Sequence, residues 1–122
     1  MEKILTFSIA AYNVEKYLDK LLKTIICVPN HEMVEVLVVN DGSKDSTAQI
    51  AKEYEKNYAG VVRLIDKENG GHGSTINRGI KEAKGKYFKA IDGDDWVDSE
   101  ALEKLLNDLT QIDSDLVLMD YK

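Results

Sequence analysis

The stretch VEVLVVNDGSKDSTAQIAKEY, residues 34–54, decides the fold of this chain. Its first part, 34–39, is apolar and rich in β-branched residues, as in a strand that is buried on both faces. Residues 46–58 follow with apolar side chains at helical spacing, which are Ile50, Ala51 and Tyr54. Asp45 precedes this segment and can accept hydrogen bonds from the first N–H groups of a helix, so we expect it to be the N-cap. The stretch therefore predicts a strand, a polar turn and a helix.

The same unit recurs on both sides of this stretch. We expect strands at 4–10, 34–39, 61–65, 87–91 and 116–119, and helices at 14–26, 46–58, 74–83 and 99–109. Gly85 is expected to stop the third helix, which carries Ile76 and Ile80. Alternating strands and helices form a mostly parallel sheet with helices on both faces, so we predict one α/β domain, 1–122. No closing helix follows the last strand, and we expect the domain to be truncated there relative to a longer protein.

The charge and composition of the chain limit the classes of partner that it is expected to bind. With 16 Lys and Arg against 22 Asp and Glu, the net charge of −6 disfavours nucleic acid and anionic lipid. A phosphate-bearing ligand then needs a cation between itself and a carboxylate-rich site. Cys27, the only cysteine, stands among apolar neighbours and is expected to be a buried thiol in a reducing compartment. No run approaches the roughly 20 apolar residues of a transmembrane helix, and a cytoplasmic location is expected.

Polar residues follow the predicted strands. Ligands of open α/β sheets bind beyond the carboxyl ends of the strands, where Tyr12, Asp41 and the acidic turn 92–95 stand. A short acceptor such as Asp41 can bind the imide N–H of a pyrimidine or a ribose hydroxyl, and Tyr12 can stack on the base. A solvated turn for Asp41 and a packing residue for Tyr12 are the alternatives, and both stay open.

The acidic turn Asp92-Gly93-Asp94-Asp95 is the strongest chemical signal. Three carboxylates within four residues repel one another unless a cation offsets them, and their hard oxygens favour Mg²⁺ or Mn²⁺. A solvated acidic turn is the alternative. The turn fits an EF-hand poorly, because Trp96 would occupy its fifth ligand position and the segment follows a strand.

The loop 69–74 offers backbone N–H groups ahead of a helix that is expected to start near Thr75, a geometry suited to anions. It lacks the G-x-G-x-x-G pattern and a Walker lysine, which argues against dinucleotide and P-loop sites. His72 can contact a phosphate or cap the loop. Four basic side chains are expected to be solvated surface charge, namely Lys67, Arg78, Lys84 and Lys86.

In this order, the motifs resemble the family 2 glycosyltransferases of GT-A fold over nearly the whole chain. Residues 8–13 resemble the opening strand and Tyr-Asn turn of that family, and 38–47 its Asp-Asp-Gly-Ser-x-Asp-x-Thr motif. Residues 69–79 with 83–87 resemble its third block, and 92–95 its Asp-x-Asp motif. The resemblance implies the Rossmann-like, nucleotide-binding half of a GT-A domain.

The resemblance also implies an inverting hexosyltransferase that uses a nucleotide-diphosphate sugar, with UDP preferred, in polysaccharide or cell-envelope synthesis. It implies a glycan or lipid-linked acceptor and a place in the cytoplasm or peripherally at the cytoplasmic membrane face. The residues it assigns to nucleotide-sugar binding are Ala10, Tyr12, Asn13, Asp41, Gly71, Asn77, Asp92 and Asp94. It assigns Asp94 and Asp95 to a divalent metal, Mn²⁺ or Mg²⁺.

Three positions depart from the family pattern. Ala10 stands where many relatives have proline, Asn40 replaces an aspartate, and Ile76 replaces an arginine. No catalytic base is identified, and we expect it beyond Lys122. A catalytically inactive nucleotide-binding fragment is therefore one alternative. A receiver-type phosphoacceptor domain is another, although its acidic pair after the first strand is missing here.

Overall fold

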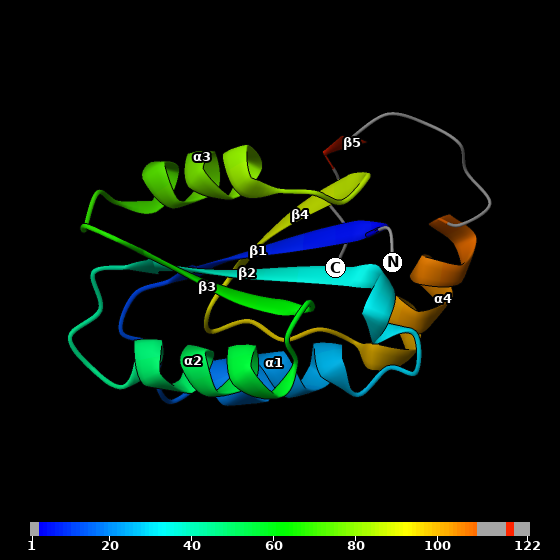
Figure 1. Ribbon diagram of the computed structural model, residues 1–122, viewed down its shortest axis with the longest axis horizontal. Coiled ribbons are helices and arrows are strands. Elements are labelled where there is room, and N and C mark those ends of the chain that lie inside the picture. The colour runs from blue at the N-terminus through cyan, green and yellow to red at the C-terminus, as the bar shows by residue number, and fades with distance from the viewer. Residues whose placement is uncertain (1–2, 110–116, 119–122) are drawn as a thin grey trace.

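The computed structural model describes residues 3–109 and 117–118, and these form a parallel sheet between helices (Figure 1). The strands are β1 (Leu5–Ala11), β2 (Val34–Asp41), β3 (Val62–Lys67), β4 (Tyr87–Asp92) and β5 (Val117–Leu118). The helices are α1 (Leu18–Ile26), the short 3₁₀ helix η1 (His31–Met33), α2 (Thr47–Asn57), α3 (His72–Glu82) and α4 (Ser99–Leu109). Their order along the chain confirms the predicted alternation.

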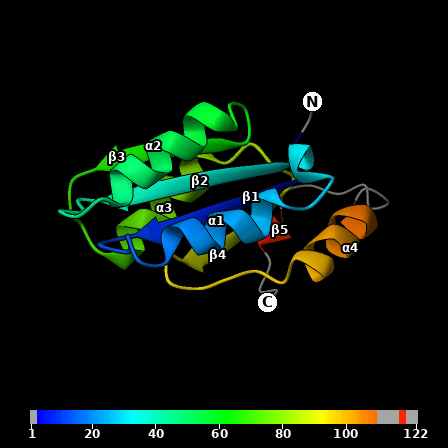
Figure 2. The ribbon, with the colours of Figure 1, turned by 90° about the horizontal axis from the view of Figure 1, so that it is seen from below.

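The described strands lie in the order β3-β2-β1-β4-β5, and every neighbouring pair is parallel. Helices α1 and α2 cover one face of the sheet and α3 covers the other (Figures 1 and 2). The predicted α/β fold, with a parallel sheet and helices on both faces, is confirmed.

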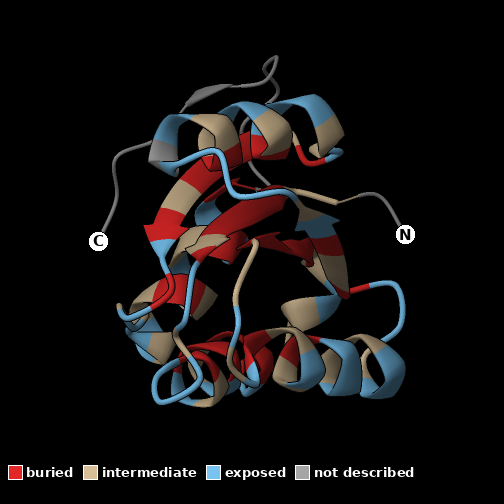
Figure 3. Cartoon of the chain, turned by 90° about the vertical axis from the view of Figure 1, so that its left-hand side faces the viewer, coloured by how far each residue is buried: buried red, intermediate tan, exposed pale blue. Residues whose placement is uncertain are grey.

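The central strands carry the core. Every residue of β2 is buried, and so is every residue of β1 except Ala10, as expected for strands with helices on both sides (Figure 3). Helix α1 packs on them through four side chains with no exposed surface, which are Leu18, Leu21, Leu22 and Ile25. Helix α4 adds Leu102 and Leu106, which are both buried.

Two helix starts differ from the prediction by more than one residue. Helix α1 begins at Leu18 rather than 14, because the Val14 carbonyl accepts the N–H groups of Tyr17 and Leu18 and closes a turn. Helix α3 begins earlier than predicted, at His72, directly after Gly71 with its positive φ of 89°. The loop ahead of α3 is therefore shorter than the predicted 69–74, and Gly71 is its last residue.

The prediction that Asp45 caps α2 needs one correction. The N-cap position is Ser46, whose side chain makes no cap hydrogen bond. The Asp45 carboxylate binds the helix start instead, since Oδ1 accepts the N–H of Thr47 at 2.9 Å. Its Oδ2 also accepts the N–H of Glu15 at 3.2 Å, so this carboxylate joins two loops. Burial alone would raise the pKa of Asp45, but these hydrogen bonds hold it below its ordinary value.

The predicted burial of Cys27 is wrong. Cys27 is exposed and is the C-cap of α1, one residue past its buried face, where its Sγ lies 3.1 Å from the Ser99 Oγ. Ile80 is also 39% exposed, because α3 packs on the sheet through the buried Thr75 and Gly79 instead. A Cβ at Gly79 would lie 2.7 Å from the Cβ of Ser8, so α3 approaches β1 closely.

Gly85 does not stop α3, which ends at Glu82. It lets the chain pass against β1, since a Cβ on Gly85 would lie 2.8 Å from the backbone nitrogen of Thr6 and 2.9 Å from the carbonyl carbon of Leu5. These are backbone atoms of a paired strand and have little room to move. The glycine is thus required by packing against β1.

Gly85→Ala is expected to lower the free energy of unfolding by about 1–3 kcal/mol, because the added methyl group overlaps the backbone of β1. Equilibrium urea unfolding measures the change. Gly73→Ala is the matched control, since a Cβ there meets nothing within 4 Å. The control should leave stability unchanged or raise it by up to about 1 kcal/mol. Equal losses in both variants would contradict the close approach.

Candidate functional site

A pocket of about 410 Å³ lies at the carboxyl ends of the strands, and we call it the edge pocket. Its lining residues come from the ends of β1, β2 and β4 and from the start of α3: Ala10, Ala11, Tyr12, Val14, Asp41, Asn69, Gly71, Thr75, Asp92, Gly93 and Asp94. The strand ends converge because the register is parallel, with Ala11 paired to Asn40 and Ala10 paired to Asp92. The structure thus brings the separate motifs of the sequence into one site.

The structure places most of the predicted nucleotide-sugar residues around this pocket. Those that line it are Ala10, Tyr12, Asp41, Gly71, Asp92 and Asp94. Asn77 is exposed on α3 and is not among its lining residues, and neither is Asn13. Tyr12 is 48% exposed, so part of this residue is accessible to a ligand.

Asp41 is almost fully buried, and its carboxylate accepts hydrogen bonds from the loop ahead of α3. Its Oδ1 accepts the Lys67 ammonium at 2.8 Å and the Gly70 N–H at 2.9 Å, and Oδ2 accepts the Gly71 N–H at 3.1 Å. Its carbonyl oxygen accepts the Asn69 side-chain amide at 3.1 Å. Two of the backbone N–H groups that the sequence offers to an anion, those of Gly70 and Gly71, therefore bind an anion of the protein itself.

The same contacts set the charge state of Asp41. Burial alone would raise the pKa of this carboxyl group, because it disfavours the charged form. The hydrogen bonds from Lys67 and from the Gly70 and Gly71 N–H groups favour the charged form and hold the pKa below its ordinary value. Asp41 is therefore an ionised acceptor at neutral pH.

The expectation that Lys67 is a solvated surface charge is wrong. Its side chain is 14% exposed, and its ammonium group donates to Asp41, to the Glu68 carbonyl at 2.6 Å and to the Ser74 Oγ at 2.8 Å. Asp41 and Lys67 each stand two residues past the end of a predicted strand, 34–39 and 61–65, but the pairing of these strands is needed to bring the two side chains together. In the parallel register of β2 and β3 they are direct partners.

Asn13 serves the loops around the pocket. It has a positive φ of 52°, donates its backbone N–H to the Ser43 Oγ at 2.9 Å and accepts the Lys44 N–H on its side-chain oxygen at 2.8 Å. These bonds join the loop after β1 to the loop after β2. Asn13 thus keeps Tyr12 and Asp41 at neighbouring positions.

The contacts of Asn40 explain why asparagine suits a position where the family motif has aspartate. Its amide donates to the Asp66 carboxylate at 2.8 Å, and its side-chain oxygen accepts the Ser43 N–H at 3.1 Å. An aspartate at this buried position has no N–H to donate and would face Asp66 with like charge. The asparagine therefore suits the neighbouring strand.

The acidic turn separates two pockets. The Asp95 N–H binds the Asp92 carbonyl at 3.0 Å, and the Gly93 N–H binds the Ala10 carbonyl at 3.0 Å, which ties the turn to β1. A Cβ at Gly93 would lie 2.8 Å from a methyl carbon of Val14, so a larger residue here would displace the Val14 side chain. Asp92 and Asp94 are exposed at the edge pocket, whereas Asp95 is half-buried and lines the other pocket.

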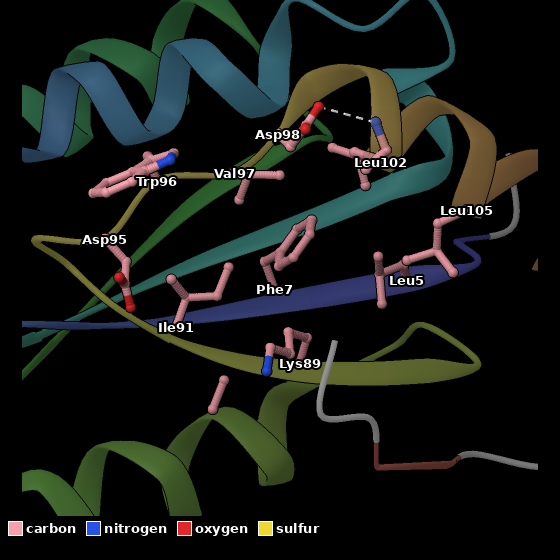
Figure 4. Close-up of a pocket in the computed structure, with 12 residues that line it drawn as sticks. Leu5, Phe7, Lys89, Ile91, Asp95, Trp96, Val97, Asp98, Leu102 and Leu105 are labelled. Carbon is pink, nitrogen blue, oxygen red and sulfur yellow. Dashed lines mark hydrogen bonds between the residues drawn. The ribbon is translucent and has the colours of Figure 1, made fainter. Parts of the chain in front are cut away.

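The other pocket, here called the apolar pocket, has a volume of about 370 Å³ and lies between the sheet and α4 (Figure 4). Its lining residues are Leu5, Phe7, Lys89, Ala90, Ile91, Asp95, Trp96, Val97, Asp98, Ala101, Leu102 and Leu105. Trp96 is 70% exposed at its rim, and Lys89 is 8% exposed. Sequence reasoning assigned a role to neither of them.

The carboxylate oxygens of the acidic turn suit a hard cation whose other ligands come from a bound phosphate and from water. Within the described residues, no group of three or more His, Cys, Asp or Glu side chains is placed to hold a metal ion. Mg²⁺ is commonly held by one or two carboxylates together with substrate phosphates and water. Asp92 and Asp94 at the edge pocket fit that arrangement, and the metal assignment of Asp94 and Asp95 stays a prediction.

The third sequence block brings no free arginine to the pocket. Arg78 lies on α3 and donates its Nε–H to the Glu82 carboxylate at 3.0 Å, one turn along the same helix. Ile76 is half-buried. Lys67, which comes from β3, is a largely buried cation that pairs with Asp41 beside the edge pocket.

A parallel α/β sheet with helices on both faces places the chain in the doubly wound class, whose members bind ligands at the carboxyl ends of their strands. The sequence model of "Glycosyl transferase family 2" matches residues 6–122. The chain belongs to this family, which confirms the resemblance that its motifs suggested and replaces the receiver-type alternative.

Several known proteins are similar to the chain. It is 32% identical to the glycosyltransferase GlyA of Streptococcus pneumoniae over 117 residues, 96% of this chain and 16% of that protein. It is 38% identical to the minor teichoic acid biosynthesis protein GgaB of Bacillus subtilis over 97 residues, 79% of this chain and 11% of that protein. Relatives of the chain thus include a protein of cell-envelope glycan synthesis.

Solved structures of S. aureus TarS share the fold. The complex of TarS with UDP matches with a TM-score of 0.76 and 28% identity, over 88% of this chain and 32% of that one. The complex with UDP-GlcNAc matches with a TM-score of 0.75 and 31% identity, over 89% and 31% of the two chains. The chain therefore spans a third or less of these proteins. No helix in the described part of the chain is long and apolar enough to cross a bilayer.

Acid should destabilise the fold through Asp41. Because its folded-state pKa lies below the ordinary 3.8, the ionised carboxylate stabilises the fold above that pH. This contribution is lost as the pH falls through the folded-state pKa. Asp41→Asn should lower the free energy of unfolding by about 3 kcal/mol at neutral pH, since it leaves Lys67 without its charged partner. The variant should then lose less stability than the unchanged chain when the pH falls below about 4.

Urea unfolding from neutral pH to below about pH 3 measures both effects. Asp108→Asn, at an exposed position of α4, is the matched control and should keep the acid dependence of the unchanged chain. An Asp41→Asn variant with that same acid dependence would show that the Asp41 carboxylate does not contribute to it.

Proposed function

We propose that this chain is the donor-binding part of a hexosyltransferase that moves a sugar from a nucleotide-diphosphate sugar to an acceptor hydroxyl with inversion. The observation that carries the proposal is the edge pocket, where Tyr12, Asp41 and the acidic turn meet at the strand ends. The TarS complexes support UDP as the nucleotide, because that protein shares the fold and is solved with UDP and with UDP-GlcNAc.

Asp41 and Tyr12 are proposed to hold the base end of the donor. An ionised carboxylate accepts hydrogen bonds, so Asp41 suits an imide N–H or a ribose hydroxyl, while the exposed Tyr12 ring suits stacking. Ala10 and Gly71 line the pocket with little side-chain volume, so a ligand can approach their backbone. Asn13 is proposed to act indirectly, through the loops it joins. The role of Asn77 rests on the family resemblance.

The acidic turn is proposed to hold the diphosphate end with Mn²⁺ or Mg²⁺. A bound divalent ion would neutralise the charge that develops on the leaving nucleoside diphosphate. Asp94 faces the edge pocket and is proposed as a ligand, with Asp92 in contact with the donor. Asp95 is proposed to contribute less, because it lines the apolar pocket.

The acceptor and its activation complete the proposal. An inverting transfer needs a base that deprotonates the acceptor hydroxyl, and we propose that this base is supplied from beyond Lys122. The acceptor is proposed to be a glycan or a lipid-linked glycan of polysaccharide or cell-envelope synthesis, in keeping with relatives such as GgaB. The site is proposed to work in the cytoplasm, peripherally at the membrane face. This chain alone should then bind donor without efficient transfer, whereas rapid transfer would contradict the placement of the base.

A UDP-sugar with Mn²⁺ should raise the melting temperature, since a ligand that binds only the folded state stabilises it. At about 100 times its Kd, the expected shift is about 10 °C. EDTA should remove most of this shift, because the acidic turn repels the diphosphate without a cation. A panel of nucleotide sugars in a thermal-shift assay measures the effect and identifies the preferred donor.

Variants of the acidic turn test which of its carboxylates bind the cation. Asp94→Asn should abolish the part of the shift that depends on Mn²⁺, Asp95→Asn should reduce it less, and Asp108→Asn should leave it unchanged. Equal stabilisation in EDTA would exclude the cation bridge. An absence of stabilisation by every nucleotide sugar tested would contradict the donor site itself.

A further inference from the structure

Lys67 is enclosed by oxygen atoms and has no donor left for a ligand. An ammonium group has three N–H donors, and the Lys67 Nζ lies 2.8 Å from the Asp41 Oδ1, 2.6 Å from the Glu68 carbonyl and 2.8 Å from the Ser74 Oγ. Its side chain is 14% exposed. Lys67 therefore acts on anything in the edge pocket through its neighbours.

Asp41 is the neighbour that reaches the pocket. A carboxylate offers about four lone-pair positions, two on each oxygen. Oδ1 accepts two hydrogen bonds, from Lys67 and Gly70, and in the described part of the chain Oδ2 accepts one, from Gly71. One acceptor position on Oδ2 remains, on a side chain that lines the edge pocket.

The charge of Asp41 decides what that position can bind. An ionised carboxylate only accepts, so it pairs with a ring N–H, such as that of the uracil imide. A protonated carboxyl group also donates, and would pair equally well with a bare ring nitrogen, as in cytosine. Removing the buried ammonium group leaves a buried carboxylate without its counter-charge, which favours the protonated form or a rotated side chain.

We propose that Lys67 is a positioning residue for base recognition: it holds Asp41 ionised and in place, so that the Oδ2 lone pair selects nucleobases that present a ring N–H. This inference rests on the proposed function, because it concerns the base end of the same donor. It assigns the selection to an ion pair between β2 and β3, with Lys67 making no contact to the ligand.

Two nucleosides test this role. Uridine has the ring N–H, and 3-methyluridine carries a methyl group in its place. The unchanged chain should bind uridine about tenfold more tightly than 3-methyluridine, which is the value of one hydrogen bond to a charged group. Calorimetric titration of both ligands gives the ratio of their Kd values. A general loss of structure lowers both affinities together and does not change this ratio.

Substitutions of Lys67 then test whether this residue causes the preference for uridine. Lys67→Met and Lys67→Gln should bring the ratio close to one by weakening uridine, and Lys67→Arg should restore it in part, because it keeps the charge. Lys52→Met, at an exposed position of α2, is the matched control and should keep the full ratio. Circular dichroism and melting confirm that each variant is folded, and Lys67→Gln carries the test if Lys67→Met does not fold.

The outcomes separate the two proposals. A full ratio in the folded Lys67→Gln variant would overturn the role of Lys67 and leave the donor site standing. A ratio of one in the unchanged chain, with uridine bound, would overturn base selection by Asp41 and with it this inference. A chain that binds neither nucleoside nor UDP would contradict the proposed function first.

Discussion

The parallel pairing of β1 with both β2 and β4 is the constraint on which the site depends. In a parallel sheet all carboxyl ends lie at one edge, and the register sets Ala11 opposite Asn40 and Ala10 opposite Asp92. Residues that are up to about eighty positions apart along the chain thereby come within reach of one ligand. A shift of one residue in either pairing would turn these side chains to the other face of the sheet.

Within this edge, charge is arranged in two different ways. The Asp41 carboxylate is buried and is neutralised internally by Lys67 and by two backbone N–H groups, so it needs no ion from solution. The carboxylates of Asp92 and Asp94 are exposed, and among the described residues they have no metal-binding cluster around them. One end of the pocket is therefore complete in the folded chain, whereas the other can gain ligands from what it binds.

The sequence predicted the fold and the place of the site because both follow from repeating patterns. The helix at 99–109 was predicted with its observed bounds, and the strand ends marked the edge pocket. Errors occurred where one residue depends on a neighbouring element. The apolar neighbours of Cys27 do not reveal that it stands just past the buried face of α1, and the burial of Lys67 follows only from the register of β2 and β3. That Asp95 lies at a different pocket from Asp94 depends on the path of the turn, which composition does not contain.

Trp96 is the single tryptophan of the chain, and it is 70% exposed beside the acidic turn. An indole in contact with water already emits as it would in an unfolded chain, so its fluorescence is a poor indicator of whether the core is intact. The same position makes it a local optical reporter. Quenchers and ligands that enter the apolar pocket will change its emission, while events in the buried sheet will leave that emission nearly constant.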